Sequence, residues 1–285
     1  MFQVLALLSF LICFNSNAAT LTFSVVTPPQ PLNWFSPRTL SMPTARNSLA
    51  RDMAPIGHIS ISLQCETKNE YGVSSVSTGM SRASRKTSQK IVTREKLGLA
   101  SMLYDFEGAL DTAKNVEAEN RLAAKAGRLG QIQLLISEST CQESLRFLKF
   151  WIESGSFRHY GGKFDPKTGG GSGCAAFGVQ FLKMAKFAIP ESESNKINAR
   201  GWLRNVIIPH ALYGDRRIYS VNFLRLAFTH LPWATTTELG VPYSTYDPEL
   251  VFDWIYSQAP NGVVEQDLRN MATGYSTYST ERFYE

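Results

Sequence analysis

The sequence predicts an α+β fold in which an antiparallel sheet packs on a helix that begins at a cysteine. Residues 57–65, GHISISLQC, alternate between apolar and polar side chains, as a strand with one buried face does. Turn-forming residues follow, and residues 71–80, YGVSSVSTGM, indicate the second strand of a hairpin. Residues 174–188 carry apolar side chains at helical spacing, and Pro190 ends this helix. Strands that alternate with separate helices are typical of the α+β class.

Two further elements are expected within the central domain, residues 56–190. Residues 128–137, RLGQIQLLIS, indicate a third strand. The apolar side chains of residues 141–154 fall at helical spacing, and Ser139 or Thr140 is expected to cap that helix.

Three other segments give weaker signals. The many Ala, Glu and Lys residues of 104–127 predict a helix with a polar surface. Residues 20–55 are rich in proline, and we expect them to form an extended lead-in rather than a core element. Residues 191–285 mix helical and turn signals, and we expect a helical C-terminal extension that packs on the site or covers it.

The N-terminus has the pattern of a secretory signal. Residues 1–19 combine an apolar run from Val4 to Phe14 with Ser16 and Ala18 at the positions of a cleavage signal. No later segment is apolar over the length that spans a bilayer. We therefore expect export to the periplasm or the outside of the cell.

The charge of the chain suits an envelope partner. The formal net charge is +5 at pH 7, and residues 1–19 contribute none of it. A modest basic excess favours anionic polymers, and in an exported protein these belong to the envelope rather than to nucleic acid. We expect a cell-wall or other envelope polymer as partner, with peripheral association to the envelope.

The cysteine count is odd once a signal peptide is removed. Cys13 would leave with the signal, and Cys65, Cys141 and Cys174 would remain. In an oxidising compartment one thiol is then unpaired. If Cys65 and Cys141 form a disulfide, Cys174 is the free thiol; the alternative is three free cysteines.

Cys174 is the candidate nucleophile. It follows the glycine-rich GGGSG segment and begins a helix, where the helix dipole lowers the pKa of a thiol and free N–H groups can bind an oxyanion. A nucleophilic cysteine also needs a base, and the sequence offers His58, His159, His210 and His230. His58 is favoured because it begins a strand on its polar side. We expect neither a metal nor another cofactor.

Two short motifs resemble the NlpC-type papain-like hydrolases. YGGKFDPKTGGGSGCAAFGVQFL resembles their nucleophile segment, and IGHISISL resembles their histidine strand. His58 precedes Cys174 by 116 positions, which resembles the circularly permuted branch. That branch includes lecithin:retinol-acyltransferase-like enzymes and bacterial envelope hydrolases. The resemblance implies a permuted papain-like fold over about residues 56–188.

The resemblance also implies the roles of individual residues. Cys174 would be the nucleophile, and His58 the base. A polar residue that orients the histidine is expected on the neighbouring strand, at Glu70, Ser75 or Ser77. Two features depart from the family: Ala175 and Ala176 follow the cysteine, and Arg158 stands where family members have a tyrosine. The residues expected in a substrate loop are His159, Tyr160, Gly161, Gly162 and Gly173.

The expected function is therefore that of an exported cysteine hydrolase. Its substrate would be an amide or ester, most simply a cell-wall peptide. Three alternatives stay open. The first is a lipid acyltransferase or thioesterase of the same fold. The second is an enzyme similar to the L,D-transpeptidases that uses His159 with Cys174. The third is an inactive module that binds an envelope component.

Overall fold

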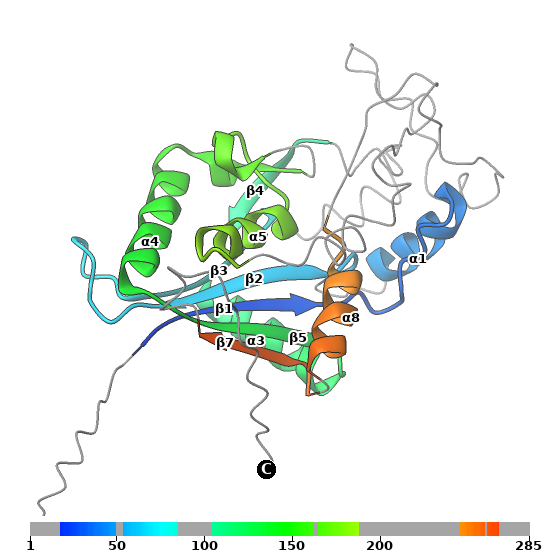
Figure 1. Cartoon of the computed structure of the whole chain (residues 1–285). Coiled ribbons are helices and arrows are strands. Elements are labelled where there is room, and N and C mark those ends of the chain that lie inside the picture. Colours follow the sequence, from blue (N-terminus) through cyan, green and yellow to red (C-terminus); the bar gives the residue numbers. More distant parts are fainter. Residues whose placement is uncertain are drawn as a thin grey trace, which may run out of the picture.

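The protein has an α+β fold built on a mixed sheet of seven strands (Figure 1). The computed structural model describes residues 18–49, 54–84, 104–161, 165–187, 246–259 and 261–267. Across the sheet the strand order is β6-β4-β3-β2-β1-β5-β7. The strands are β1 (Ala19–Val26), β2 (His58–Gln64), β3 (Ser75–Arg82), β4 (Phe106–Leu110), β5 (Leu129–Ile136), β6 (His159–Tyr160) and β7 (Val263–Asp267). The helices of the described residues are α1 (Pro37–Leu49), α3 (Ala113–Lys125), α4 (Glu138–Glu153), α5 (Cys174–Met184) and α8 (Pro248–Gln258).

Strand β1 corrects the prediction that residues 20–55 form no core element. It lies in the middle of the sheet, antiparallel to both β2 and β5. Leu21, Phe23 and Val25 point into the core and are fully buried. The prolines that suggested a lead-in begin only at Pro28, after the strand has ended. The rest of the expected signal segment, residues 1–17, lies outside the described residues.

The predicted hairpin and third strand are confirmed. β2 and β3 pair in antiparallel register, and β5 covers residues 129–136. The prediction of one helix over residues 104–127 is wrong in its first third. Phe106–Leu110 forms β4, which pairs with β3 and β6, and Thr112 then caps α3 by accepting a hydrogen bond from the Asn115 backbone N–H. The residues of α3 favour a helix by composition, and the prediction extended that helix over the strand that precedes it.

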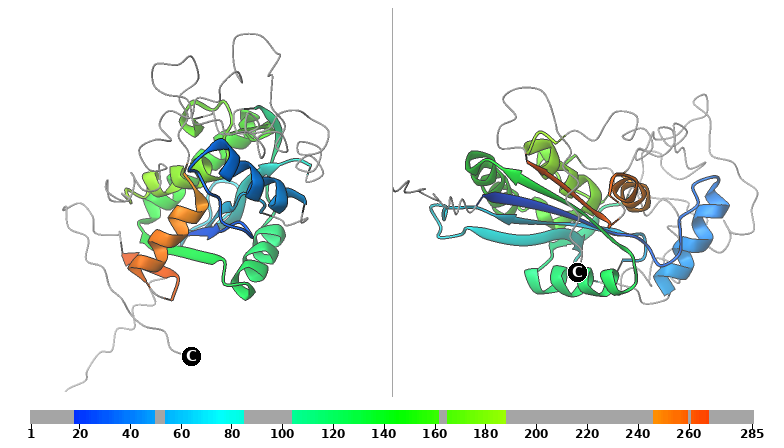
Figure 2. Two further views of the ribbon diagram at one scale, coloured as in Figure 1. Left: turned by 90° about the vertical axis from the view of Figure 1, so that its right-hand side faces the viewer. Right: turned by 60° about the horizontal axis from the view of Figure 1, so that its bottom comes forward.

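Helices cover the two faces of the sheet unequally. α4, α5 and α8 pack on one face, and α3 lies across the other (Figures 1 and 2). The main core forms on the three-helix face around Trp151, Phe177 and Phe181. The Phe177 ring contacts the rings of both Trp151 and Phe181, and Phe181 also contacts Phe147. Helix α4 begins near its predicted start, although Ser137 is the residue that caps it, by accepting from the Thr140 N–H.

The C-terminal part of the chain belongs to the same core. β7 pairs in parallel with β5, so the sheet is mixed rather than antiparallel throughout. On α8, Val251, Trp254 and Ile255 are buried with residues of the central sheet. The described portion of the expected extension therefore completes the sheet instead of standing apart from it.

The disulfide between Cys65 and Cys141 is present and ties the end of β2 to the first turn of α4. Of the two arrangements open from the sequence, it is the paired one, with Cys174 as the free thiol of the described residues. No helix within the described ranges has both the length and the apolarity of a membrane span.

Candidate active site

Cys174 is the first residue of helix α5, as predicted. The loop before it is held against β6 by two backbone hydrogen bonds, Ser172 N–H to the His159 carbonyl at 3.1 Å and Gly161 N–H to the Ser172 carbonyl at 3.4 Å. Gly171 makes this possible because its φ is +117° and a Cβ there would lie 2.5 Å from the His159 oxygen. The glycine-rich loop thus fixes the cysteine beside Tyr160.

His58 lies at the start of β2 and contacts the Cys174 side chain. Burial raises the pKa of the thiol, but hydrogen bonding from His58 and its charge, with further donation from Tyr160 and the Ile59 backbone N–H, hold that pKa below its usual value. The effect on the histidine is reciprocal. Burial lowers the pKa of His58, yet its contacts with Asp111, Cys174 and Glu119 raise that pKa well above 6.5. The two side chains therefore favour a thiolate and an imidazolium.

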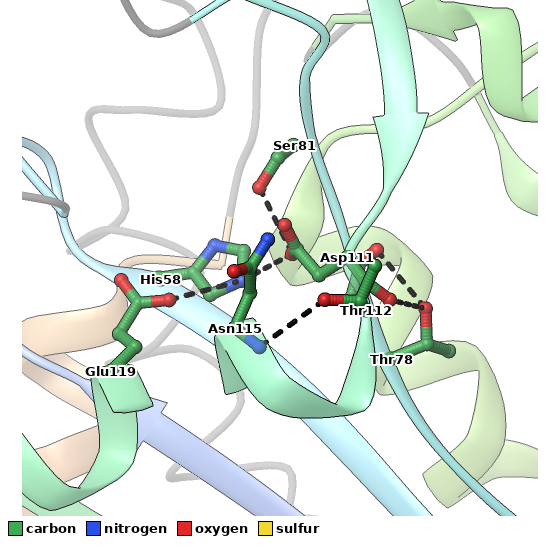
Figure 3. A network of polar contacts seen from close by, with 8 residues as sticks. His58, Thr78, Ser81, Asp111, Thr112, Asn115 and Glu119 are labelled. Carbon is green, nitrogen blue, oxygen red and sulfur yellow. Dashed lines mark hydrogen bonds and ion pairs between the residues drawn. The ribbon is translucent and has the colours of Figure 1, made fainter. Parts of the chain in front are cut away.

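Asp111 lies beside the imidazole of His58 (Figure 3). Its Oδ2 lies 3.1 Å from His58 Nε2 and accepts a hydrogen bond of 2.9 Å from the Ser81 hydroxyl. The Nε2 N–H is not aligned with that oxygen, so the contact is an ion pair rather than a hydrogen bond. A second carboxylate oxygen, Glu119 Oε2, lies 3.9 Å from the same Nε2.

The three residues predicted to orient the histidine do not contact it in this arrangement. Glu70 pairs with Lys149 at 3.4 Å on the surface, and Ser75 is exposed at the far end of β3. The Ser77 hydroxyl lies 2.7 Å from that of Ser62. The carboxylate beside the histidine is instead that of Asp111, which follows β4, one strand further along the sheet than expected. A glycine inside a predicted strand, Gly79, was the available sequence signal, because strand glycines often mark a close approach.

Tyr160 is the predicted substrate-loop residue whose side chain contacts the candidate nucleophile, Cys174. The Tyr160 side chain interacts with both the side chain and the backbone of Cys174, and this interaction helps to lower the pKa of the thiol. Burial, followed by the negative charge of Cys174, raises the pKa of Tyr160 well above 10, so the phenol keeps its proton. The Arg82 guanidinium lies over the rings of Tyr160 and Phe106, at 5.9 and 4.7 Å from their centroids.

The remaining predicted residues lie farther from the chemistry or outside the described chain. His159 is exposed, and its Nδ1 pairs with Asp105 at 3.0 Å. Gly173 is the N-cap residue of α5. Gly162, His210 and His230 fall outside the described residues. Within those described, no three His, Cys, Asp or Glu side chains are grouped as metal ligands.

The site cannot be assigned through relatives. The chain matches no protein-family model, no curated protein and no solved structure.

Proposed function

We propose that the protein is a cysteine hydrolase of the permuted papain-like type that cleaves an amide or ester bond. One observation carries the proposal: Cys174, at the N-terminus of α5, contacts His58, whose Nε2 lies 3.1 Å from Asp111 Oδ2. A nucleophile, a base and a group that orients the base are the parts that nucleophilic acyl transfer needs.

The groups suggest a two-step reaction. The Cys174 thiolate attacks the carbonyl carbon, and the C–S bond forms as the carbonyl electrons move to oxygen. In this scheme the Cys174 backbone N–H and the Tyr160 hydroxyl would donate to that oxyanion. His58 then gives its proton to the leaving amine or alcohol, and a thioester remains. Water, deprotonated by His58, then attacks the thioester carbon; the C–S bond breaks, the acid product leaves, and the Cys174 thiolate and His58 imidazolium are restored.

Tyr160 supports this proposal because its hydroxyl is a hydrogen-bond donor beside Cys174. Arg158 occupies the position where the resembled family has a tyrosine, and its guanidinium lies 5.7 Å from the Phe157 ring. Tyr160 reaches the nucleophile from β6 instead.

The substrate class follows from compartment and charge. We propose a cell-wall peptide or another envelope amide, because the chain begins with a signal-like segment and carries a net charge of +5. Acyl transfer to a lipid, or thioester hydrolysis, would use the same acyl-enzyme step. The transpeptidase alternative is less well supported, since the His159 ring pairs with Asp105 and Cys174 begins a helix in an α+β fold.

The first test is alkylation of the folded full-length chain by iodoacetamide across pH 5 to 9, followed by mass spectrometry. A small reagent is needed because Cys174 is only 6% exposed. We expect rapid labelling of Cys174 at pH 6, and a slowing of tenfold or more in His58→Ala, which removes the base. The matched control is His159→Ala, which should label as the wild type does.

The second test is turnover of peptidoglycan fragments and acyl esters. Wild type should release product and Cys174→Ala should not, with folding of both checked by circular dichroism. Slow labelling of Cys174 at every pH, or a dependence on His159 instead of His58, would overturn the proposal. Equal ligand binding by both proteins without turnover would favour the inactive binding module.

A further inference from the structure

The histidine of this site is faced by two carboxylates, although one is enough to orient a base. Asp111 Oδ2 and Glu119 Oε2 lie 3.1 and 3.9 Å from the same nitrogen, His58 Nε2. The side chains of His58, Asp111 and Glu119 are 8, 10 and 11% exposed, so water screens the three charges poorly. Figure 3 shows Glu119 reaching the imidazole from α3, on the side opposite to Ser81.

Both carboxylates are positioned by the first half of α3. Asp111 directly precedes the N-cap Thr112, and the Thr78 hydroxyl donates to its backbone carbonyl at 2.9 Å. Glu119 comes two turns later and points toward the sheet, whereas Glu117 is 78% exposed and lies 4.0 Å from Arg121. The helix therefore turns one glutamate inward to the histidine and another outward to solvent.

Among the described residues, three titratable groups act directly on His58. Asp111 follows β4, Glu119 belongs to α3 and Cys174 to α5. Beyond the sulfur lie Tyr160, which keeps its proton, and Arg82, whose guanidinium rests on the Tyr160 ring. Asp111, Glu119 and Cys174 are therefore all acidic groups, and each of them favours the protonated form of the imidazole.

We propose that Glu119 is a second positioning carboxylate, which holds His58 as an imidazolium and thereby keeps Cys174 as a thiolate before substrate binds. The proton moves from the Cys174 thiol to the unprotonated ring nitrogen of His58, and no other bond changes. With Asp111 alone, the neutral pair of thiol and imidazole would hold a larger share of the molecules at neutral pH. This inference rests on the proposed function in assigning a use to the thiolate.

The test is an NMR titration of the imidazole carbons in the full chain labelled at histidine. Comparison with His58→Gln assigns the His58 signal. In Glu119→Gln, which keeps the side-chain length and removes the charge, the His58 midpoint should fall by about one pH unit or more. Alkylation of Cys174 at pH 7 should slow by roughly tenfold. Glu117→Gln is the matched control on the same helix and should leave both measurements unchanged.

Glu119→Asp keeps the negative charge, but its side chain is shorter by one methylene, so the carboxylate lies farther from His58. The titration midpoint of His58 in this variant should lie between those in the wild type and in Glu119→Gln. If Glu119→Gln does not fold, this variant decides the question. An unchanged midpoint overturns the inference, and if wild-type Cys174 still labels rapidly, the proposed function stands. Slow labelling of wild-type Cys174 at every pH overturns the proposed function. The NMR titration still measures whether Glu119 raises the midpoint of His58.

Discussion

Gly79 is the residue that leaves room for the histidine and its carboxylate. A Cβ at this position would lie 2.9 Å from His58 Nε2, 3.0 Å from Asp111 Oδ2 and 3.1 Å from the Ile59 carbonyl oxygen. The Gly79 carbonyl also accepts the Asp111 backbone N–H at 2.9 Å, which draws the two strands together. Any side chain here must displace one member of the ion pair.

Gly79→Ala should therefore impair the site more than it impairs the fold. We expect alkylation of Cys174 at pH 6 to fall at least tenfold, because the imidazole is displaced, with a loss of about 1–3 kcal/mol in the free energy of unfolding from overpacking. Ser77→Ala on the same strand is the control, since its hydroxyl meets Ser62 and not the histidine. If Cys174 in Gly79→Ala is alkylated as fast as in the wild type, the close packing of Gly79 against His58 and Asp111 is contradicted.

At the scale of single elements, Glu138 of α4 holds the turn that connects β2 to β3. Its carboxylate accepts from the backbone N–H groups of Glu66 and Thr67, from the Thr67 hydroxyl, and from the Gln142 amide. Burial opposes ionisation, but these donors together lower the pKa of Glu138. The contact lies beside the disulfide between Cys65 and Cys141, so covalent and polar links join the same two elements.

Glu138→Gln should destabilise the protein in a pH-dependent way. A lowered folded-state pKa contributes stability above the unfolded-state value of 4.5, and that contribution is lost as pH falls through the folded-state pKa. Because the Glu138 side chain is only partly buried, we expect a loss of only about 1 kcal/mol at pH 7. Urea denaturation at pH 7 and pH 3 measures it, with exposed Glu143→Gln as control. A loss of the same size at both pH values would exclude the charged contacts as its cause.

Local patterns predicted the elements whose side chains alternate or repeat regularly. Period-two alternation identified β2 and β5, and the glycine run followed by apolar helical spacing placed Cys174 at the start of α5. β1 has the same alternation, yet the prolines that follow it outweighed the signal. Asp111 could not be found in this way because it meets His58 only through the pairing of β3 with β4, and β4 was taken for helix.

At the scale of the whole molecule, two segments far apart in the sequence, residues 32–34 and 247–249, meet near the site. The Trp34 indole N–H donates to Asp247 Oδ2, and the Leu32 backbone N–H donates to Glu249 Oε2 at 2.7 Å. Asp247 is also the N-cap of α8, where its Oδ1 accepts from the Glu249 N–H. A Cβ at Gly57 would lie 2.6 Å from Pro248 Cβ, so the start of α8 packs directly against the neighbour of His58.

This junction should respond to pH through Asp247. Burial raises its pKa from 3.8 to about 6, which the hydrogen bonds from Glu249 and Trp34 only partly offset. The folded protein thus binds this proton more tightly than the unfolded chain does. The contribution of Asp247 to stability is therefore greatest below its unfolded-state pKa and declines as pH rises through the folded-state pKa.

Comparison of wild type with Asp247→Asn isolates that contribution. Between pH 4 and pH 7 the free energy of unfolding of the wild type should fall relative to the variant, by up to about 3 kcal/mol. Urea denaturation at half-unit steps of pH measures the difference, and its sign is opposite to that expected for Glu138. A difference that stays constant over this range would mean that Asp247 is ionised in both states.

Because Pro248 packs against Gly57, loosening of this junction at higher pH should also slow the alkylation of Cys174.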